Sequence, residues 1–364
     1  MKIGVVKDLK QGEARVGMTP ENVKILVEVW HTLYVENNAG FGAGFPNEQY
    51  IAAGAKIVER EETWEAEMMV RVKEPLEEEY QYLKEGQIIW GFLHLPANKA
   101  CVEKMIEMKV TAFSAENIAT EGTFPLLKPL SAIAGRRAVN IGQYYLEKQH
   151  GGQGILLPGI PESGIEAGHI VIFGGGTAAD IALSIGCSVL ILELSDTRIQ
   201  ELETRYAGKK LQIVKSTTEA LEEHIKKADV FISTILIPGA KPPKLVKEYM
   251  VKSMKPGAVI VDIAIDQGGT VETIDHATNH AEPVFTRHNV IHYAVPNMPG
   301  ATPRTSTLVM SKGNIEYLKQ IADNGLEEAL NLSESLRSGM SVYKGTIVSH
   351  ALADSIGLPY TKIK

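Results

Sequence analysis

One stretch in the middle of the sequence constrains the fold more than any other. The β-rich run His169–Phe173 leads into the triplet Gly174-Gly175-Gly176, which is followed by a helical pattern over Ala178–Ile185 and a second apolar run that ends in Glu193. A strand, a glycine turn, a helix and another strand in this order form a βαβ unit, whose two strands lie parallel in one sheet. The sequence therefore predicts a parallel sheet built around this stretch.

The order of these elements also meets the requirements of a dinucleotide site. Glycines let the backbone approach a pyrophosphate, the start of the helix offers free amide N–H groups, and an acid after the second strand accepts the ribose hydroxyls. Gly174, Gly176 and Ala179 fit the spacing G-x-G-x-x-A, and Thr177 stands at the helix start. Glu193 would repel a 2′-phosphate, which favours NAD over NADP. The alternative is an ordinary turn followed by a solvated Glu193.

Similar units recur along the chain and predict an α/β protein with two mostly parallel sheets, each flanked by helices. One series of strands and helices precedes Pro129, and a second begins at His169. Between them lie a helical pattern from Pro129 to about Gln149 and a Gly/Pro-rich stretch over 151–168. A length of 364 residues favours two domains. After Arg304 the chain turns helical to about Leu336, and a purely helical tail would make a poor third domain. We therefore expect a discontinuous substrate or catalytic domain over 1–127 and 302–364, and an NAD-binding domain over 128–301.

Composition and charge argue against several classes of function. The 37 basic and 44 acidic residues give a formal net charge of −7 without a Lys/Arg block, which disfavours a nucleic-acid partner. Cys101 and Cys187, the two cysteines, stand far apart and in no metal-ligand spacing, which fits a reducing compartment. No apolar run approaches the roughly 20 residues of a membrane span, and the first one is too short for a signal peptide. We expect a soluble, cytoplasmic protein with small-molecule substrates and no metal ion.

Several longer blocks carry a resemblance to one family. They are Gly12–Val16, Val72–Leu76, Phe92–Leu95, Ser131–Arg136, Asp262–Gly269, Pro296–Ala301 and Pro303–Thr307. Together they span the chain in order and closely resemble the alanine dehydrogenase family, and more distantly the nucleotide-binding subunit of proton-translocating transhydrogenase. The resemblance implies an NAD-dependent enzyme that interconverts L-alanine with pyruvate and ammonia, with two Rossmann-like domains around a cleft and a homo-oligomeric, hexameric assembly.

Four residues in these blocks match the substrate and acid/base positions of the family. Arg15 and Lys73 match the residues that hold the carboxylate and the carbonyl of pyruvate, and His94 and Asp266 match the acid/base pair. These residue types suit the chemistry, because arginine grips a carboxylate in bidentate fashion, lysine polarises a keto oxygen and histidine exchanges a proton near neutral pH. Taken singly, each has an ordinary structural or surface role as its alternative.

Further positions match the cofactor side of the family's site. Ser131 matches a residue near the nicotinamide or the pyrophosphate, and Asn297 and Met298 belong to the loop that approaches the nicotinamide. Leu236 follows a strand end, where open α/β sheets bind ligands. Helix capping is the alternative role for Ser131, and turn formation is the alternative for Asn297.

The sequence departs from the family pattern in the glycine motif and near the expected nicotinamide pocket. The segment after Thr177 lacks about four residues, close to one helical turn, including the last glycine of the motif. Phe92, Leu130 and Ala132 stand where the family has tyrosine, methionine and glutamate. These departures leave two alternatives to an active NAD-dependent alanine dehydrogenase. One is a weak or inactive relative that binds a small amino or oxo acid, and the other is a dehydrogenase for a related 2-oxo acid.

Overall fold

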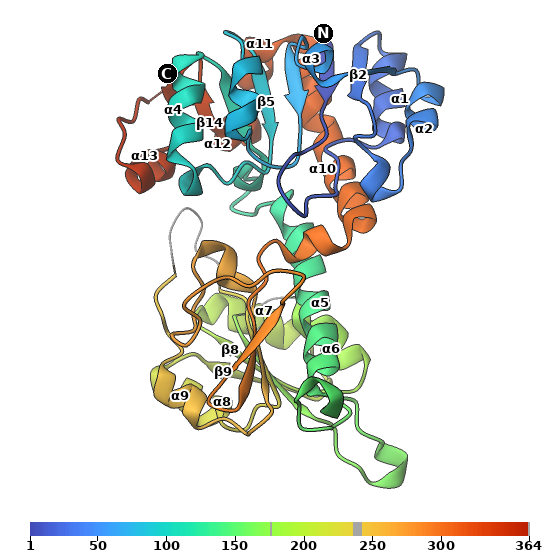
Figure 1. Cartoon of the computed structure of the whole chain (residues 1–364). Helices are drawn as coiled ribbons and strands as arrows, with labels where there is room; N and C mark the ends of the chain where they lie inside the picture. Colours follow the sequence, from blue (N-terminus) through green and yellow to red (C-terminus); the bar gives the residue numbers. More distant parts are fainter. Residues whose placement is uncertain (175–176, 236–241, 363–364) are drawn as a thin grey trace. The chain divides into compact units, whose positions relative to one another are not determined.

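The chain folds into two units. The computed structural model describes residues 1–174, 177–235 and 242–362. One unit combines Met1–Leu130 with Pro299–Lys364, and the other is the continuous segment Ser131–Met298. In Figure 1 the first unit therefore carries both ends of the colour scale, blue and red, whereas the second is green to orange.

The first unit is built on an eight-stranded sheet of order β15-β14-β6-β5-β4-β1-β2-β3. The pairs among β1 to β6 are parallel, whereas β14 pairs antiparallel with β6, and β15 antiparallel with β14. The order 3-2-1-4-5-6 of the parallel strands is that of a doubly wound sheet, with its switch point between β1 and β4. The strands are β1 (Lys2–Val5), β2 (Thr32–Glu36), β3 (Lys56–Val58), β4 (Met68–Val70), β5 (Ile88–Gly91), β6 (Thr111–Ser114), β14 (Met340–Tyr343) and β15 (Thr346–Ile347).

The helices of the first unit begin and end at recognisable signals. Thr19 caps α1, since its side chain accepts the amide N–H of Asn22, and Pro20 occupies the first helical position. The helical tail is interrupted at Gly325, which has φ +78°, and at Ser333, so three helices replace one continuous run. The helices are α1 (Pro20–Glu28), α2 (Asn47–Ala52), α3 (Arg60–Thr63), α4 (Lys99–Glu107), α10 (Pro303–Asn324), α11 (Leu326–Leu332), α12 (Glu334–Gly339) and α13 (His350–Ile356).

The second unit has a seven-stranded sheet of order β12-β13-β11-β10-β7-β8-β9. Its strands are parallel except β12, which forms an antiparallel hairpin with β13, and the switch point lies between β7 and β10. The strands are β7 (His169–Phe173), β8 (Ser188–Glu193), β9 (Leu211–Lys215), β10 (Val230–Ser233), β11 (Val259–Asp262), β12 (Val284–Arg287) and β13 (Val290–Tyr293). The helices are α5 (Leu127–Leu146), which begins in the first unit, α6 (Ala178–Ser184), α7 (Asp196–Arg205), α8 (Thr218–Ile225) and α9 (Glu248–Lys252).

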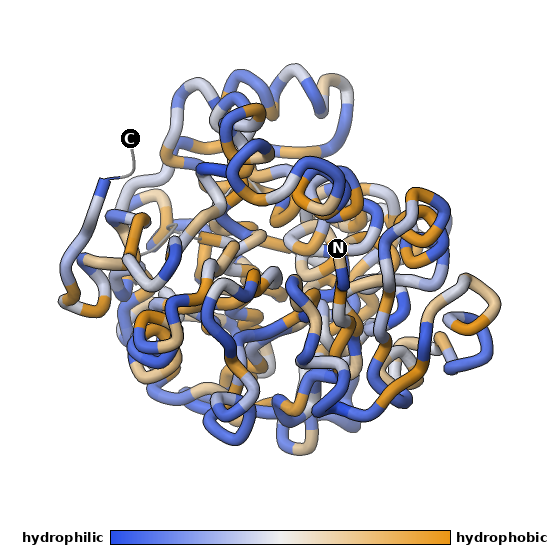
Figure 2. Tube along the Cα trace, turned by 90° about the horizontal axis from the view of Figure 1, so that it is seen from above, coloured by the Kyte–Doolittle hydropathy of each residue, from blue (hydrophilic) through white to orange (hydrophobic). Residues whose placement is uncertain are grey.

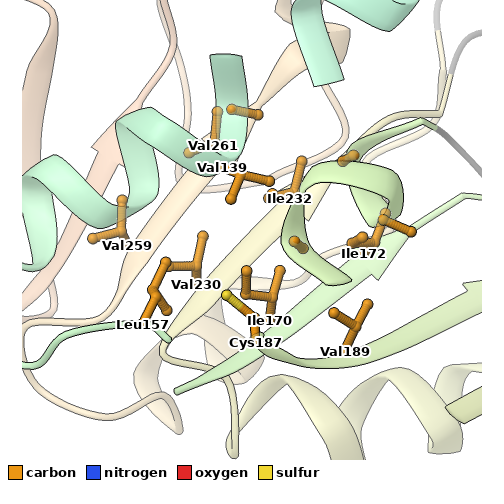
Figure 3. Close-up of a cluster of buried hydrophobic side chains, with 14 of the residues drawn as sticks. Val139, Leu157, Ile170, Ile172, Cys187, Val189, Val230, Ile232, Val259 and Val261 are labelled. Atoms are coloured by element: carbon orange, nitrogen blue, oxygen red, sulfur yellow. The ribbon is translucent and has the colours of Figure 1, made fainter. Parts of the chain in front are cut away.

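Both faces of this second sheet are buried. Alternate residues of the strands, among them Ile170, Ile172, Val230 and Ile232, pack on one face against Val139 of α5 (Figure 3). The intervening residues form a second apolar cluster on the other face. A parallel sheet covered on both sides gives strands that are apolar almost without interruption, which is why these runs could be recognised in the sequence. The expected fold class, two mostly parallel sheets flanked by helices, is confirmed.

Hydrophobic residues occur in short runs along the described part of the chain. Along the tube of Figure 2, orange and blue alternate without a long apolar stretch. In the described part of the chain, no helix has the length and apolar character needed to cross a membrane.

Candidate active site

The expected substrate residues of the first unit gather at the carboxyl ends of neighbouring strands. Lys73 follows β4 and His94 follows β5, and the two strands pair in parallel. Parallel neighbours end at the same edge of a sheet, where open α/β proteins bind ligands. The charge of Lys73 acts on both Glu13 and Glu116, while Glu13 is hydrogen-bonded to Arg15. The structure therefore brings Arg15, Lys73 and His94 into one ionic cluster with these two carboxylates.

Arg15 is buried and held in a fixed orientation by Glu13. Its Nε lies 2.7 Å from Oε1 of Glu13 and its Nη2 lies 2.5 Å from Oε2, a bidentate pair. The next residue donates its amide N–H to Oγ1 of Thr307 on α10 at 3.2 Å. A Cβ on Gly17 would lie 3.0 Å from the backbone of Arg71, so a larger residue would push this loop away from the chain after β4.

The same pair determines the ionisation of Glu13. Burial opposes the charged form, but the hydrogen bonds and the charge of Arg15, together with the charge of Lys73, hold the pKa of Glu13 below its ordinary value. The cluster therefore contains a buried ion pair in which the interactions with Arg15 and Lys73 favour the charged form of Glu13.

The backbone of Lys73 is held from both sides by a buried ionic network. Oδ1 of Asp8 accepts the amide N–H of Lys73 at 3.1 Å, and Nε of Arg71 donates to the carbonyl of Lys73 at 2.5 Å. Arg71 itself pairs with Asp8 and Glu79, at 3.1 and 2.9 Å, and all three side chains are fully buried. Burial raises the pKa of Asp8 above its ordinary value despite the charge of Arg71.

His94 adopts a left-handed backbone conformation, with φ +51° and ψ 36°. Such a conformation is unfavourable for a residue with a side chain and persists only where surrounding contacts hold it. Its amide N–H donates to Oε1 of Glu116 at 2.8 Å. Glu116 lies in the 3₁₀ turn Ala115–Asn117, directly after β6.

In the second unit, Asp266 and Asn297 lie side by side. Asp266 belongs to the 3₁₀ helix η7 (Ile263–Gln267), whose start is capped by the buried carboxylate of Asp262. The amide N–H of Asn297 donates to Oδ1 of Asp266 at 2.7 Å, and Asn297 has φ +55°. Met298 is buried, and its carbonyl accepts a hydrogen bond from Arg137 of α5. Asp266 is exposed and supported by the loop that was expected to face the nicotinamide.

Glycine is required at two positions near the end of β7, where the chain packs closely against itself. Gly174 has φ +101°, and a Cβ there would lie 2.7 Å from Oγ1 of Thr234 at the end of β10. On α5, a Cβ on Gly135 would lie 2.9 Å from the amide nitrogen of Ala178. Oγ1 of Thr177 lies 3.5 Å from the carbonyl oxygen of Ser131, whose side chain is exposed.

Glu193 ends β8 as the sequence predicted. Its Oε1 accepts the amide N–H groups of Leu194 and Ser195, at 2.8 and 3.0 Å, which fixes the carboxylate at the strand end. Gly174, with its positive φ at the switch point, and an acid at the end of the next strand fit a dinucleotide. Gly176 and Leu236, which were also expected to bind the cofactor, lie outside the described residues.

The helix that follows the glycine turn is short but well anchored. α6 has seven residues, and Ala178, Ala179 and Ala182 form its buried face. Asp180 accepts hydrogen bonds from Arg205, at 2.8 and 2.9 Å, and from the hydroxyl of Tyr206, at 2.8 Å. The shortened helix is therefore a packed part of the second unit.

Sequence reasoning missed three carboxylates of the first unit. Glu13 stands two residues before Arg15, in a block that carried the resemblance, but its pairing with Arg15 was not foreseen. Asp8 and Glu116 follow strands β1 and β6, and their position after a strand was the available signal. Among the residues that the structure describes, no group of His, Cys, Asp and Glu is arranged to hold a metal ion.

Comparison with known proteins identifies the family. The model of the alanine dehydrogenase/PNT N-terminal domain matches residues 4–134, and that of the C-terminal domain matches residues 138–350. Alanine dehydrogenase 1 of Staphylococcus aureus strain Mu50 is 55% identical over 368 residues, covering 100% of this chain and 99% of the relative. Because this chain has 364 residues, at least four positions of that alignment have no counterpart here.

Solved structures agree with this assignment. A structure described as L-alanine dehydrogenase superposes with a TM-score of 0.92 at 39% identity, covering 98% of this chain and 99% of the other. A transhydrogenase from Sinorhizobium meliloti, at 23% identity and a TM-score of 0.83 over 96% of this chain and all of the other, shares the fold. With both domain models matched in order along most of its length, the chain belongs to the alanine dehydrogenase/PNT family.

Proposed function

We propose that this protein is an NAD-dependent L-alanine dehydrogenase. In one direction it would convert L-alanine, NAD⁺ and water into pyruvate, ammonium and NADH with release of a proton, and it would also catalyse the reverse. The observation that carries the proposal is the cluster of Arg15, Lys73 and His94 at the carboxyl ends of adjacent strands. The similarity to alanine dehydrogenases over the whole chain supports it.

Arg15 and Lys73 bind the substrate in this proposal. The guanidinium of Arg15 takes the carboxylate of pyruvate or alanine, and its orientation by Glu13 reduces the ordering that binding requires. The ammonium of Lys73 donates to the keto oxygen of pyruvate and makes its carbon more electrophilic. The network around Asp8 and Arg71 holds the backbone from which this ammonium extends.

His94 and Asp266 exchange protons and orient the nitrogen nucleophile. His94 donates a proton as the oxygen of pyruvate leaves as water, and it accepts that proton in the oxidation of alanine. Asp266 orients the attacking ammonia or water, and its charge lies beside the expected nicotinamide loop at Asn297.

NAD supplies or accepts the hydride when bound. We assign its binding to Gly174, Gly176, Thr177 and Glu193 of the glycine motif and to Ser131, Leu236, Asn297 and Met298. Residues 128–301 would then form the NAD-binding domain, and residues 1–127 with 302–364 the substrate domain. The positive φ of Gly174 and the carboxylate of Glu193, which two backbone N–H groups hold in place, support this assignment.

We further propose that the protein acts in the cytoplasm as a homo-oligomer, specifically a hexamer. Large apolar side chains are exposed at Leu156, Ile160 and Ile165, in the segment that follows α5, and exposed apolar groups of this kind often mark subunit contacts. Sedimentation analysis of the purified protein tests the assembly, and a monomer would contradict it.

Steady-state kinetics tests the function. Purified protein with pyruvate, ammonium and NADH should consume NADH, alanine with NAD⁺ should produce it, and NADPH should be a poor substitute. The rates with other small 2-oxo acids in place of pyruvate show which substrate the enzyme prefers. A folded sample that binds pyruvate or alanine but consumes no NADH would instead favour the non-catalytic relative, which the seven-residue α6 makes a specific alternative.

A further inference from the structure

Glu116 is a buried carboxylate for which the mechanism above has no use. Its Oε1 accepts the amide N–H of His94 at 2.8 Å, while Oε2 is buried without a hydrogen-bond partner among the described residues. An unpaired buried carboxylate oxygen is unfavourable unless nearby charges compensate for the lost water. Burial raises the pKa of Glu116, and the charges of His94 and Lys73 oppose that rise. The positive charges that stabilise ionised Glu116 therefore belong to two proposed active-site residues, His94 and Lys73.

The hydrogen bond from His94 also has a structural consequence. The left-handed region is unfavourable for a non-glycine residue, so the backbone at His94 needs contacts that favour it. The bond to Glu116 joins the end of β5 to the turn after β6, two neighbouring parallel strands. It fixes the residue from which the imidazole extends.

We propose that Glu116 is a positioning residue for His94, and that its negative charge favours the protonated imidazole when a carboxylate substrate is bound. This inference rests on the proposed function. Among these five side chains, the charges of Arg15 and Lys73 balance those of Glu13 and an ionised Glu116 when the imidazole is neutral, and the neighbouring Asp8 is paired with Arg71. A proton on His94 then leaves one net positive charge, which matches the single negative charge of pyruvate. Alanine is a zwitterion without net charge, so it matches the uncharged cluster in which the imidazole of His94 is neutral. A neutral imidazole can accept the proton that the oxidation of alanine releases.

The substitution Glu116→Gln separates charge from geometry. The amide oxygen of glutamine can still accept the N–H of His94, but the negative charge is lost. We expect the protonated imidazole to be lost at lower pH, so the alkaline limb of pyruvate reduction and the acidic limb of alanine oxidation both move down by about one pH unit or more. In reductive amination above the wild-type midpoint, kcat should fall by about tenfold for each pH unit of this shift, while the KM for NADH stays unchanged.

Two further variants control the experiment. Glu116→Asp keeps the charge and should restore the pH profile towards that of the wild type, even if turnover is lower. Glu103→Gln removes a glutamate from the exposed face of α4, where it pairs with Lys99, and should leave both the profile and kcat unchanged. Circular dichroism checks that each variant is folded.

A direct titration of the imidazole keeps this test independent of the proposed activity. The NMR signal of His94, assigned by its loss in His94→Asn, is followed against pH in the wild type and in Glu116→Gln, with and without pyruvate. A midpoint that moves down by about one pH unit supports the proposal. An unchanged midpoint overturns it, because Glu116 would then be uncharged or without influence on His94. Failure of the wild type to turn over pyruvate would refute the proposed function and leave this titration interpretable.

Discussion

Lengthening the start of α6 tests whether the shortened glycine turn limits binding of NADH. The insertion Ala-Gly-Thr-Asn after Thr177 restores about one turn of helix, and with it the last glycine of the motif. Four residues add about 6 Å of helix and rotate it by only about 40° beyond a full turn. The alanine face of α6 therefore stays directed at the sheet, and the added turn extends towards the expected pyrophosphate.

The size of the effect follows from the amide groups that the missing turn would offer. Each amide hydrogen bond to a charged phosphate contributes about 1.5–3 kcal/mol, and about 1.4 kcal/mol changes a dissociation constant tenfold. Restoring one or two such bonds should lower the dissociation constant of NADH by about one to four powers of ten. Calorimetric titration with NADH measures this change, and the KM for pyruvate should not move.

A matched insertion controls for helix length. The same four residues placed after Ser184 lengthen α6 at its far end, where no ligand is expected, and should not tighten binding of NADH. The reasoning is refuted if the parent protein already binds NADH at low micromolar concentration and the insertion after Thr177 gives no gain or unfolds the chain. In that case the seven-residue helix is an accommodated variant with an intact cofactor site.

Three other predictions concern the substrate, the cofactor and the buried network. Asp266→Asn should lower turnover by about 10²–10⁴-fold without unfolding the protein, whereas Arg15→Ala should chiefly raise the KM for pyruvate. Saturation kinetics distinguishes these two effects. Near-normal turnover in Asp266→Asn would show that the acid/base role assigned to Asp266 is wrong. Glu193→Ser should raise the preference for NADPH over NADH, measured as a ratio of kcat/KM, by about tenfold or more, since a repelling charge is removed. Arg71→Met should lower the free energy of unfolding by about 3–5 kcal/mol, because buried Asp8 loses the cation it pairs with and buried Glu79 keeps only its pair with Arg60. Urea denaturation measures this, and an unchanged midpoint would contradict it.

The sequence predicted the parallel strands well because their signals are local. The runs His169–Phe173 and Val230–Ser233 coincide with β7 and β10, since strands buried on both faces are apolar throughout. The hairpins were missed. The turn between β12 and β13 uses His288 and Asn289, both with positive φ, and lacks the glycine that usually marks a two-residue turn.

The candidate site, like the fold, could be predicted from the sequence only in part. Arg15, Lys73, His94 and Asp266 could be proposed from the resemblance, and the strand ends after which the last three lie were visible in the sequence. The partners that orient them could not be foreseen, because they depend on which strands become neighbours. Glu116, for example, reaches His94 only because β5 and β6 pair in parallel.

The antiparallel strands β14 and β15 also bear on how the chain is synthesised. β14 covers the edge of β6, although more than two hundred residues separate them in the sequence. On the ribosome, the continuous segment 131–298 can close its own sheet as it emerges, whereas the first unit must wait for residues near the end of the chain. Until then the edge of β6 is open to pairing with another molecule. Nascent chains stalled before residue 340 should therefore protect the second unit from proteolysis and leave the first one open to chaperones and to aggregation.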